Sequence, residues 1–164
     1  MIKLGTTVKA NITGFGQLTG SEIEAFEKKY SIKLPQEYRA FLSKYNGGTV
    51  DPDTFVFHDE TDASSINYFL GIGLKEYYYN LSYTLDMFRD RVPDNLFPIA
   101  KDPGGNLILV GLSGNELGKI YFWDHEFEAD GSKPDMSNVH YLSSSFDTFL
   151  NGLHEFVDDE IEED

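Results

Sequence analysis

The stretch LPQEYRAFLSKYNGG, residues 34–48, carries the signals for the start, the buried face and the end of one helix. Pro35 suits the first helical position, because its φ matches a helix and it has no N–H to leave unbonded there. Apolar side chains then recur at i, i+3, i+4 and i+7, which indicates a single buried face. They are Tyr38, Phe41, Leu42 and Tyr45. Asn46 and Gly47 follow, and both tolerate the left-handed backbone conformation that ends a helix.

Three further helices are predicted from the same 3.6-residue period of apolar residues. They cover Ser21–Tyr30, about Asn80–Arg89, and a run from Ser144 or Ser145 to Phe156 or Val157. In the first, Ser21 and Glu24 have the spacing of a capping box, in which each side chain bonds a backbone N–H at the helix start. In the last, Phe146 and Phe149 lie on the apolar face, so this helix should also pack on the core.

Six segments between the predicted helices have the composition of strands. They are Thr54–Phe57, Tyr68–Ile72, Leu96–Ala100, Leu107–Leu112, Lys119–Trp123 and Val139–Leu142. The turn sequences PGGN and LSGNELG separate three of them at hairpin distances, since Gly and Asn permit tight turns. Consecutive strands joined in this way pair antiparallel, so we expect an α+β domain.

The composition fits one domain with a core rich in aromatic rings. The chain has 164 residues, of which 40% are hydrophobic and 15% aromatic, enough for one sizeable core. It has no cysteine, which excludes a disulfide framework, a thiolate zinc site and a cysteine nucleophile. Neither a signal-peptide pattern nor a run of 18 apolar residues occurs, so we expect a cytoplasmic protein without a membrane span. We expect the domain to cover residues 1–157 and an acidic tail to cover residues 158–164.

The charge balance disfavours nucleic acid as a direct partner. The formal net charge is −15, from 28 acidic and 13 basic residues, whereas a nucleic-acid binder neutralises phosphates with Lys and Arg. Seven of the acids lie in residues 155–164, where no basic residue occurs. This stretch is interpreted either as a solvated end that aids solubility or as an electrostatic attractant for a basic partner.

Five segments, taken in order, resemble the SMI1/KNR4 family, also called the SUKH superfamily. The segments are IEAFEKKYSIKLPQEYRAFLSKYNGG, FLGIG, LFPIAKDPGGNLILVGL, GKIYFWDHE and YLSSSFDTFLNGL. Together they span the chain from about Leu18 to Val157. The positions interpreted as structural residues of the family motif are Leu34, Pro35, Tyr38, Phe41, Leu42, Asn46, Gly47, Gly48, Pro98, Ile99, Gly104, Gly105, Trp123, Phe146 and Phe149.

The resemblance implies a single SUKH-like α+β domain, in which about four helices flank a curved, mainly antiparallel sheet. It also implies a binding function. Bacterial members are immunity proteins that neutralise a cognate toxin domain, often a nuclease or deaminase, whereas fungal members scaffold cell-wall signalling. The chain lacks the long disordered extensions of fungal members, which favours the bacterial role. The alternative is an intracellular adaptor that binds a protein or peptide, and a small hydrolase is a third hypothesis.

Three segments of the sequence contain residues typical of catalytic or metal-binding sites, but none matches a complete motif. After the strand ending at Trp123, Asp124 and Glu126 would share one face without His125 if the strand continued, because neighbouring strand residues point to opposite faces. FHDETD, residues 57–62, lacks the Gly and terminal Glu of an EF-hand loop and is interpreted as a solvated loop. KDPGGN, residues 101–106, lacks the Lys-Ser/Thr pair of a P-loop and is interpreted as a hairpin turn. We therefore predict no enzyme, no metal and no cofactor.

The predicted partner is a cognate toxin domain of basic character. Acidic side chains would attract it and raise the association rate, while exposed rings would supply lasting affinity. The acids assigned to this surface are Asp51, Asp53, Asp59, Glu60, Asp62, Asp124 and Glu126. The alternative interpretation of these residues is ordinary loop acidity. The oligomeric state is not predicted.

Overall fold

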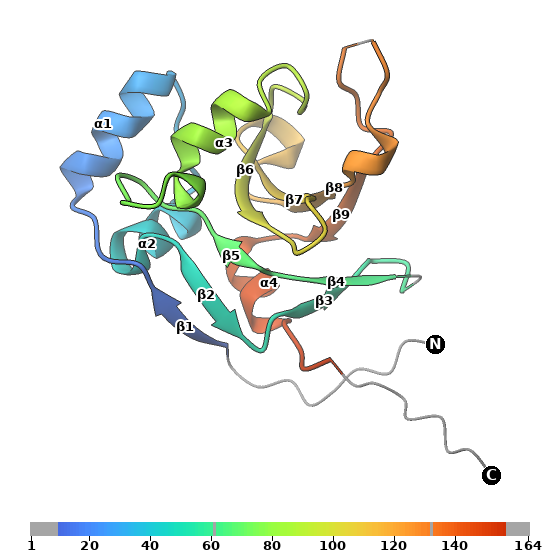
Figure 1. The fold of residues 1–164 in the computed structure, drawn as a ribbon, viewed down its shortest axis with the longest axis horizontal. Helices are drawn as coiled ribbons and strands as arrows, with labels where there is room; N and C mark the ends of the chain where they lie inside the picture. The colour runs from blue at the N-terminus through green and yellow to red at the C-terminus, as the bar shows by residue number, and fades with distance from the viewer. Residues whose placement is uncertain (1–9, 61, 132, 157–164) are drawn as a thin grey trace.

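The protein folds around a curved antiparallel sheet. The computed structural model describes residues 10–60, 62–131 and 133–156, and in this part of the chain the sheet has seven strands in the order β1-β2-β5-β6-β7-β8-β9. They are β1 (Asn11–Gly14), β2 (Gly48–Asp51), β5 (Tyr68–Phe69), β6 (Leu96–Lys101), β7 (Leu107–Gly111), β8 (Ile120–Trp123) and β9 (Val139–Ser143). All neighbours pair antiparallel, and Figure 1 shows a strongly curved layer with β1 and β2 at one end and β9 at the other. The predicted α+β class is confirmed.

Four α-helices, three short 3-10 helices and a separate hairpin complete the described part of the chain. The α-helices are α1 (Gly20–Tyr30), α2 (Gln36–Tyr45), α3 (Leu81–Met87) and α4 (Phe146–Asn151). The 3-10 helices are η1 (Tyr77–Tyr79), η2 (Gly114–Glu116) and η3 (His125–Phe127), and the hairpin pairs β3 (Thr54–Val56) with β4 (Ala63–Ser65). The 3.6-residue period therefore located all four α-helices, although their ends differ from the predicted ones.

The N-cap of helix α1 lies two residues before the predicted one. Thr19, not Ser21, is the N-cap: its Oγ1 accepts a hydrogen bond from the Glu22 N–H at 3.2 Å, and Glu22 Oε1 accepts one from the Thr19 N–H at 3.3 Å. The sequence thus holds two capping-box spacings. In the earlier capping box, Leu18 precedes the cap and Ile23 follows it. Both side chains are buried, so they pack the start of the helix on the core.

Helix α2 is the helix predicted from residues 34–48, with its start shifted by one residue. Pro35 is the N-cap rather than the first helical residue, because its ψ of 144° is extended. At the other end, Asn46 takes the left-handed conformation with φ 49°, and its N–H donates to the Leu42 carbonyl at 2.9 Å. The buried residues of this helix are Tyr38, Phe41 and Leu42.

The Asn46-Gly47-Gly48 turn joins α2 to the sheet through close backbone contacts. The Asn46 Oδ1 accepts from the Ile72 N–H at 2.7 Å, and its Nδ2 donates to the Ile72 carbonyl at 2.9 Å. Gly47 has φ +81°, and a Cβ there would lie 2.6 Å from the Phe69 carbonyl oxygen. Glycine is the residue that fits such a position. The family segments ending in NGG and FLGIG are therefore in direct contact.

Helix α4 is much shorter than the predicted helix, which was to reach residue 156 or 157. It ends at Asn151, and the following segment returns to β3. The His154 N–H donates to the Thr54 carbonyl at 2.8 Å, and the Thr54 N–H donates to the His154 carbonyl at 3.0 Å. Leu153 is buried from this non-helical segment, so its place in the helical period was coincidental. The predicted tail at 158–164 lies outside the described residues.

Three strands were missed by the sequence prediction. Strands β1, β2 and β4 have the sequences NITG, GTVD and ASS, which are too short and too polar to show an alternation of apolar residues. The six predicted strands are all present, but the one at Thr54–Phe57 pairs with β4 outside the main sheet and the one at Tyr68–Ile72 is reduced to β5. The PGGN and LSGNELG turns join β6 to β7 and β7 to β8 as predicted.

Each face of the sheet carries its own apolar cluster. The larger cluster includes the motif residues Leu34, Tyr38, Phe41, Leu42, Ile99, Phe146 and Phe149, and so lies against α1, α2 and α4. The smaller cluster contains Val92, Leu96, Leu107, Leu109, Tyr121 and Trp123. Along β8, Tyr121 and Trp123 belong to the smaller cluster and Ile120 and Phe122 to the larger one, as the two-residue period of a strand requires.

A bulge in β6 accommodates the proline of the LFPIAK segment. The register with β7 shifts between Pro98 and Ala100, so Ile99 has no paired residue on β7. The Ile99 carbonyl instead accepts from the Leu70 N–H at 2.9 Å, and the Ile99 side chain is fully buried. Proline is tolerated within a sheet at such irregular positions, because it has no N–H to donate.

Candidate protein-binding surface

The seven acids predicted to bind the partner come from three separate turns. Asp51 ends β2 and Asp53 precedes β3; Asp59, Glu60 and Asp62 are exposed in the β3–β4 turn; Asp124 and Glu126 follow β8. The structure therefore groups them much as the sequence does.

The β3–β4 turn presents its acids from a fixed backbone. The Phe57 N–H donates to the Asp62 carbonyl at 2.9 Å, and the Glu60 N–H donates to the Phe57 carbonyl at 2.8 Å. The Phe57 ring stacks on His140 of β9 with centroids 5.3 Å apart, which fixes the base of the turn against the sheet. This segment is a loop, as predicted, and the side chains of Asp59, Glu60 and Asp62 are exposed on it.

The Asp124 and Glu126 carboxylates do not share a strand face, because β8 ends at Trp123. Asp124 is the N-cap of η3, and its Oδ1 accepts from the Glu126 N–H at 3.0 Å. The His125 ring contacts Asn106 instead, with Nδ1 2.6 Å from the Asn106 Oδ1. Asp124 thus caps η3, and His125 contacts the turn between β6 and β7. The two residues that the hydrolase hypothesis would use as catalytic groups therefore have structural contacts.

The KDPGGN turn is built around a buried aspartate. The Asp102 carboxylate accepts from the Gly104 N–H at 2.9 Å, from the Asn106 N–H at 2.7 Å, from Asn106 Nδ2 at 3.0 Å and from Ser64 Oγ at 2.8 Å. Gly105 takes φ +87° at the corner. The backbone N–H groups that would cradle a phosphate already bind Asp102, so the segment is a hairpin turn, as predicted.

The described part of the chain has neither a clustered set of metal ligands nor a helix that could span a membrane. Within residues 10–60, 62–131 and 133–156, no group of three or more His, Asp or Glu side chains is arranged to hold a metal ion. None of the helices described in these ranges has both the length and the apolar character needed to cross a membrane.

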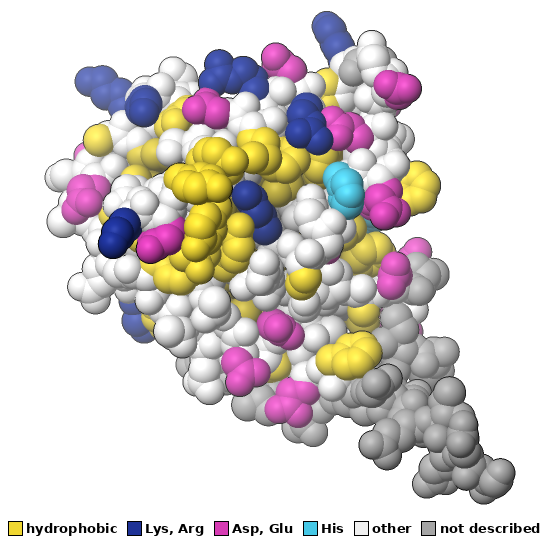
Figure 2. Space-filling model, viewed as in Figure 1, with side chains coloured by type: hydrophobic (Ala, Val, Ile, Leu, Met, Phe, Trp, Pro, Cys, Tyr) yellow, Lys and Arg dark blue, Asp and Glu magenta, His cyan; other side chains and the backbone are white. Residues whose placement is uncertain are grey.

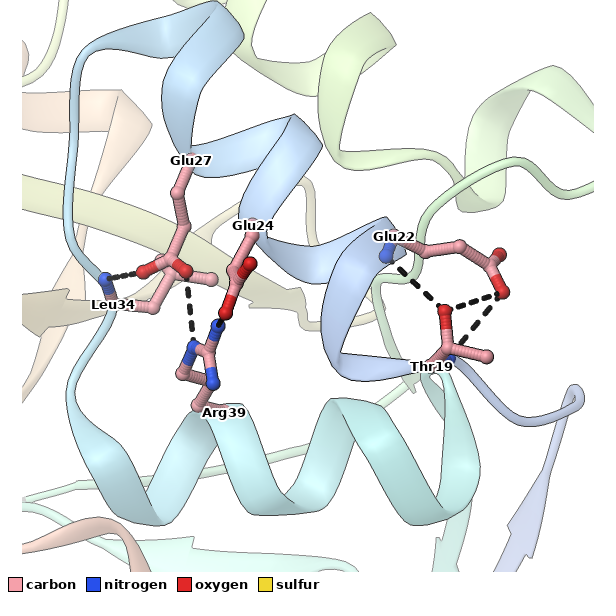
Figure 3. A network of polar contacts seen from close by, with 6 residues as sticks. All are labelled: Thr19, Glu22, Glu24, Glu27, Leu34 and Arg39. Carbon is pink, nitrogen blue, oxygen red and sulfur yellow. Dashed lines mark hydrogen bonds and ion pairs between the residues drawn. The ribbon is translucent and has the colours of Figure 1, made fainter.

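A polar network fixes the motif loop between α1 and α2. It lines a groove of about 640 Å³. The buried Glu27 accepts from the Leu34 N–H through Oε2 at 2.8 Å and from Arg39 Nε through Oε1 at 2.9 Å, while Glu24 lies 3.8 Å from the Arg39 guanidinium (Figure 3). Because Glu27 joins the loop to both helices, we assign this network to folding.

A group of tyrosines lies exposed where η1 and α3 meet the sheet. We define the tyrosine surface as the rings of Tyr68, Tyr77, Tyr78, Tyr79 and Tyr83. Tyr77 is 63% exposed and Tyr78 is 39% exposed, and the other three rings are partly buried. Figure 2 shows hydrophobic side chains gathered in the middle of this face around a basic side chain. Tyrosine is enriched at protein interfaces, because its ring is apolar and its hydroxyl can bond.

The rings of the tyrosine surface support one another. Tyr77 meets Tyr83 edge to face with centroids 4.8 Å apart, and Tyr68 meets Tyr79 in the same way at 4.9 Å. Tyr78 contacts Tyr79 at 4.5 Å. Rings held by such contacts lose little conformational entropy when a partner binds, which favours affinity.

The backbone beneath the tyrosine surface is also held in place. The Asn80 side chain accepts from the Leu74 N–H at 2.8 Å and donates to the Leu74 carbonyl at 2.9 Å. The Gly71 N–H donates to the Tyr79 carbonyl, and the Leu81 N–H donates to the Gly71 carbonyl, both at 2.8 Å. The segment from Leu74 to Leu81 is therefore a rigid platform joined to the FLGIG segment.

Lys101 is the basic residue of this surface. It ends β6 opposite Tyr68, and its Nζ lies 5.7 Å from the centre of the Tyr83 ring. Burial lowers the pKa of the Lys101 ammonium. Burial, with the neighbouring tyrosines Tyr79, Tyr78 and Tyr83, raises the pKa of the Tyr68 phenol, so this hydroxyl stays protonated at neutral pH.

Sequence reasoning missed these tyrosines. Their signal was the run Tyr77-Tyr78-Tyr79 in KEYYYN, beside a predicted helix that carries Tyr83. Three consecutive rings cannot all enter one core from a regular strand, since neighbours point to opposite faces. The run could therefore have been interpreted as partly exposed.

The fold and this surface define a small α+β domain suited to binding another macromolecule. The chain matches the sequence model of the SMI1 / KNR4 family (SUKH-1) over residues 17–152. It is 31% identical over 161 residues to the SPbeta prophage-derived uncharacterized protein YokK of Bacillus subtilis (strain 168), and the match covers 89% of this chain and 78% of that protein. The chain belongs to the SMI1/KNR4 family, so the resemblance noted in the sequence is confirmed.

Proposed function

We propose that this protein is an immunity protein, which binds a cognate toxin domain of nuclease or deaminase type in the cytoplasm of the producing cell and so neutralises it. The tyrosine surface is the observation that carries the proposal, because an exposed and rigid group of rings is suited to protein binding. Family membership and the prophage-derived relative support it, since a toxin gene and the gene of its neutralising partner must be inherited together. Binding alone is the proposed action, with no cofactor, metal or nucleic acid.

The tyrosine surface provides most of the affinity in this proposal. Rings that are exposed in the free protein and buried in the complex remove apolar area from water, and truncating such anchors has the largest effects on binding. Tyr77 and Tyr78 are the most exposed of the five rings, so they gain most from burial.

The acidic turns provide long-range attraction. With a net charge of −15, the protein attracts a basic toxin domain and repels other acidic proteins. We assign this role to the seven acids at positions 51, 53, 59, 60, 62, 124 and 126. In the same proposal, residues 1–157 form the binding domain, and the acidic tail at 158–164 adds to the attraction.

Co-expression tests the proposed function. The protein is produced together with the toxin-like C-terminal domain encoded by the neighbouring gene, and growth and co-purification are scored. We expect growth rescue and a stable complex. Lack of rescue against every toxin domain encoded beside the gene would contradict the immunity role and favour the adaptor hypothesis.

The double variant Tyr77→Ala, Tyr78→Ala is expected to weaken toxin binding about 100-fold, because it removes two anchors at the centre of the interface. Titration calorimetry with the toxin domain measures the dissociation constant. The free energy of unfolding should fall by about 1–2 kcal/mol, because the ring contacts with Tyr83 and Tyr79 are lost, while the fold stays intact. Leu117→Ala, which truncates an apolar side chain 56% exposed elsewhere, is the matched control. Equal affinities for the double variant and the wild type would remove the tyrosine surface from the proposal.

The triple variant Asp59→Ala, Glu60→Ala, Asp62→Ala is expected to slow association with the toxin about tenfold at low salt and to leave the dissociation rate nearly unchanged. Surface plasmon resonance over a range of salt concentrations measures both rates. At about 0.5 M salt the wild type and the variant should associate equally fast, because the charges are screened. An unchanged salt dependence would show that this turn takes no part in attraction.

A further inference from the structure

Lys101 is a half-buried base within the tyrosine surface. Arg39, Arg89 and Arg91 each have a carboxylate within 4 Å. Within the described part of the chain, Lys101 forms no such ion pair, although acidic residues outnumber basic ones by 28 to 13 in the whole sequence. The exposed lysines Lys29 and Lys44 also form no ion pair within the described residues, but water solvates their ammonium groups, whereas Lys101 is half-buried.

The surroundings of Lys101 are apolar and partly exclude water. The side chain is half-buried between Tyr68, its partner across β5 and β6, and Tyr83, which lies under the ammonium. Because the charged form is less well solvated at this half-buried position than in water, burial lowers the pKa of Lys101. A partly desolvated charge is stabilised when an opposite charge completes its surroundings.

We infer that the tyrosine surface receives a partner segment that presents an aspartate or glutamate carboxylate to Lys101, with apolar side chains of the same segment lying on the rings of Tyr77 and Tyr78. The carboxylate pairs with the ammonium at the centre, and the rings around it exclude water from the pair. This inference rests on the proposed function and names the chemistry of the contact.

The net charge of the protein explains why the carboxylate belongs to a macromolecule. A field from −15 charges repels small free anions, so acetate or phosphate would not collect at a single lysine. A partner that is basic overall is attracted to the protein and can carry one acidic residue to this point. An arginine on the rings is disfavoured there, because Lys101 places a like charge within the same surface.

The test uses peptides, so it does not depend on knowing the toxin. A phage library of random dodecapeptides is sorted on the wild-type protein and counter-sorted on the Tyr77→Ala, Tyr78→Ala variant. We expect the enriched peptides to share an Asp or Glu next to an apolar residue. Enrichment of basic peptides without an acid, or no enrichment at all, would overturn the inference.

Variants of the lysine then test the contact itself. Lys101→Met keeps the apolar stem and removes the charge, and it should raise the dissociation constant of an enriched peptide about tenfold. Lys29→Met, at an exposed lysine whose Nζ also lies over a ring, 5.4 Å from the centre of Tyr30, should change it less than twofold. Changing the peptide acid to its amide should weaken binding to the wild type but not to Lys101→Met. Additive losses would overturn the inference. Failed growth rescue with intact peptide binding would contradict only the immunity role.

Discussion

Glu27→Ala is expected to lower the free energy of unfolding by about 3 kcal/mol. The Glu27 carboxylate is buried and bonds both the Leu34 N–H and the Arg39 guanidinium. Its removal leaves a buried N–H without a partner and a half-buried guanidinium with only Glu24, 3.8 Å away. The expected effect lies at the low end for a broken buried pair, because the Arg39 side chain remains 31% exposed and water can reach it.

Urea unfolding followed by circular dichroism measures this effect, and Glu24→Ala is the matched control. Glu24 meets the same guanidinium, but its side chain is 74% exposed, so its loss should change stability by less than about 0.5 kcal/mol. Equal effects of the two substitutions would contradict the assignment of Glu27 as the residue that fixes the loop between α1 and α2.

The helical part of the fold was predictable because its signals are local. In residues 34–48 the apolar period and the left-handed residues at the end agree, so helix α2 differs from its prediction only by one residue at Pro35. The capping box of α1 shows the limit of such signals. Two spacings fit, and the one that begins at Thr19 is used because Leu18 beside it enters the core.

Other elements depend on contacts between segments distant in the sequence. The end of α4 is set by the backbone pairing of His154 with Thr54, a hundred positions apart, which the continuing apolar period could not reveal. Strand β2 is formed from GTVD because its neighbours β1 and β5 supply partners on both sides. A short polar segment becomes a strand through such partners rather than through its own propensity.

The candidate surface was only half predictable for a similar reason. Acidic residues in turns are mostly exposed, although the buried Asp102 is an exception, so the seven acids could be proposed from composition alone. The exposure of Tyr77 and Tyr78 depends on η1, whose position is fixed by the bonds of Asn80 and Gly71. The pairing of Tyr68 with Lys101, which brings a base among the rings, follows from the register of β5 and β6. No local pattern in the sequence encodes that register.

Trp123→Ala is expected to lower the free energy of unfolding by about 4 kcal/mol, because it opens a cavity in the smaller apolar cluster. Trp123 is fully buried and meets Phe88 edge to face with centroids 5.4 Å apart. The Arg91 guanidinium lies 5.8 Å from the centre of the Trp123 ring and bonds both oxygens of Glu128, at 2.8 and 2.9 Å. The indole therefore supports the segment after α3 and the turn after β8 together.

Chemical unfolding of the variant must be followed by circular dichroism, since Trp123 is the single tryptophan and its fluorescence is lost with it. Trp123→Phe should have a smaller effect, of about 2 kcal/mol, because it keeps an aromatic ring and removes a buried indole N–H that has no hydrogen-bond partner among the described residues. Phe127→Ala, at a ring 68% exposed four residues away, should change stability by less than about 0.5 kcal/mol. If Trp123→Ala were no more destabilising than Phe127→Ala, the second face of the sheet would not be a core, and the turn carrying Asp124 and Glu126 would be held by its own hydrogen bonds alone.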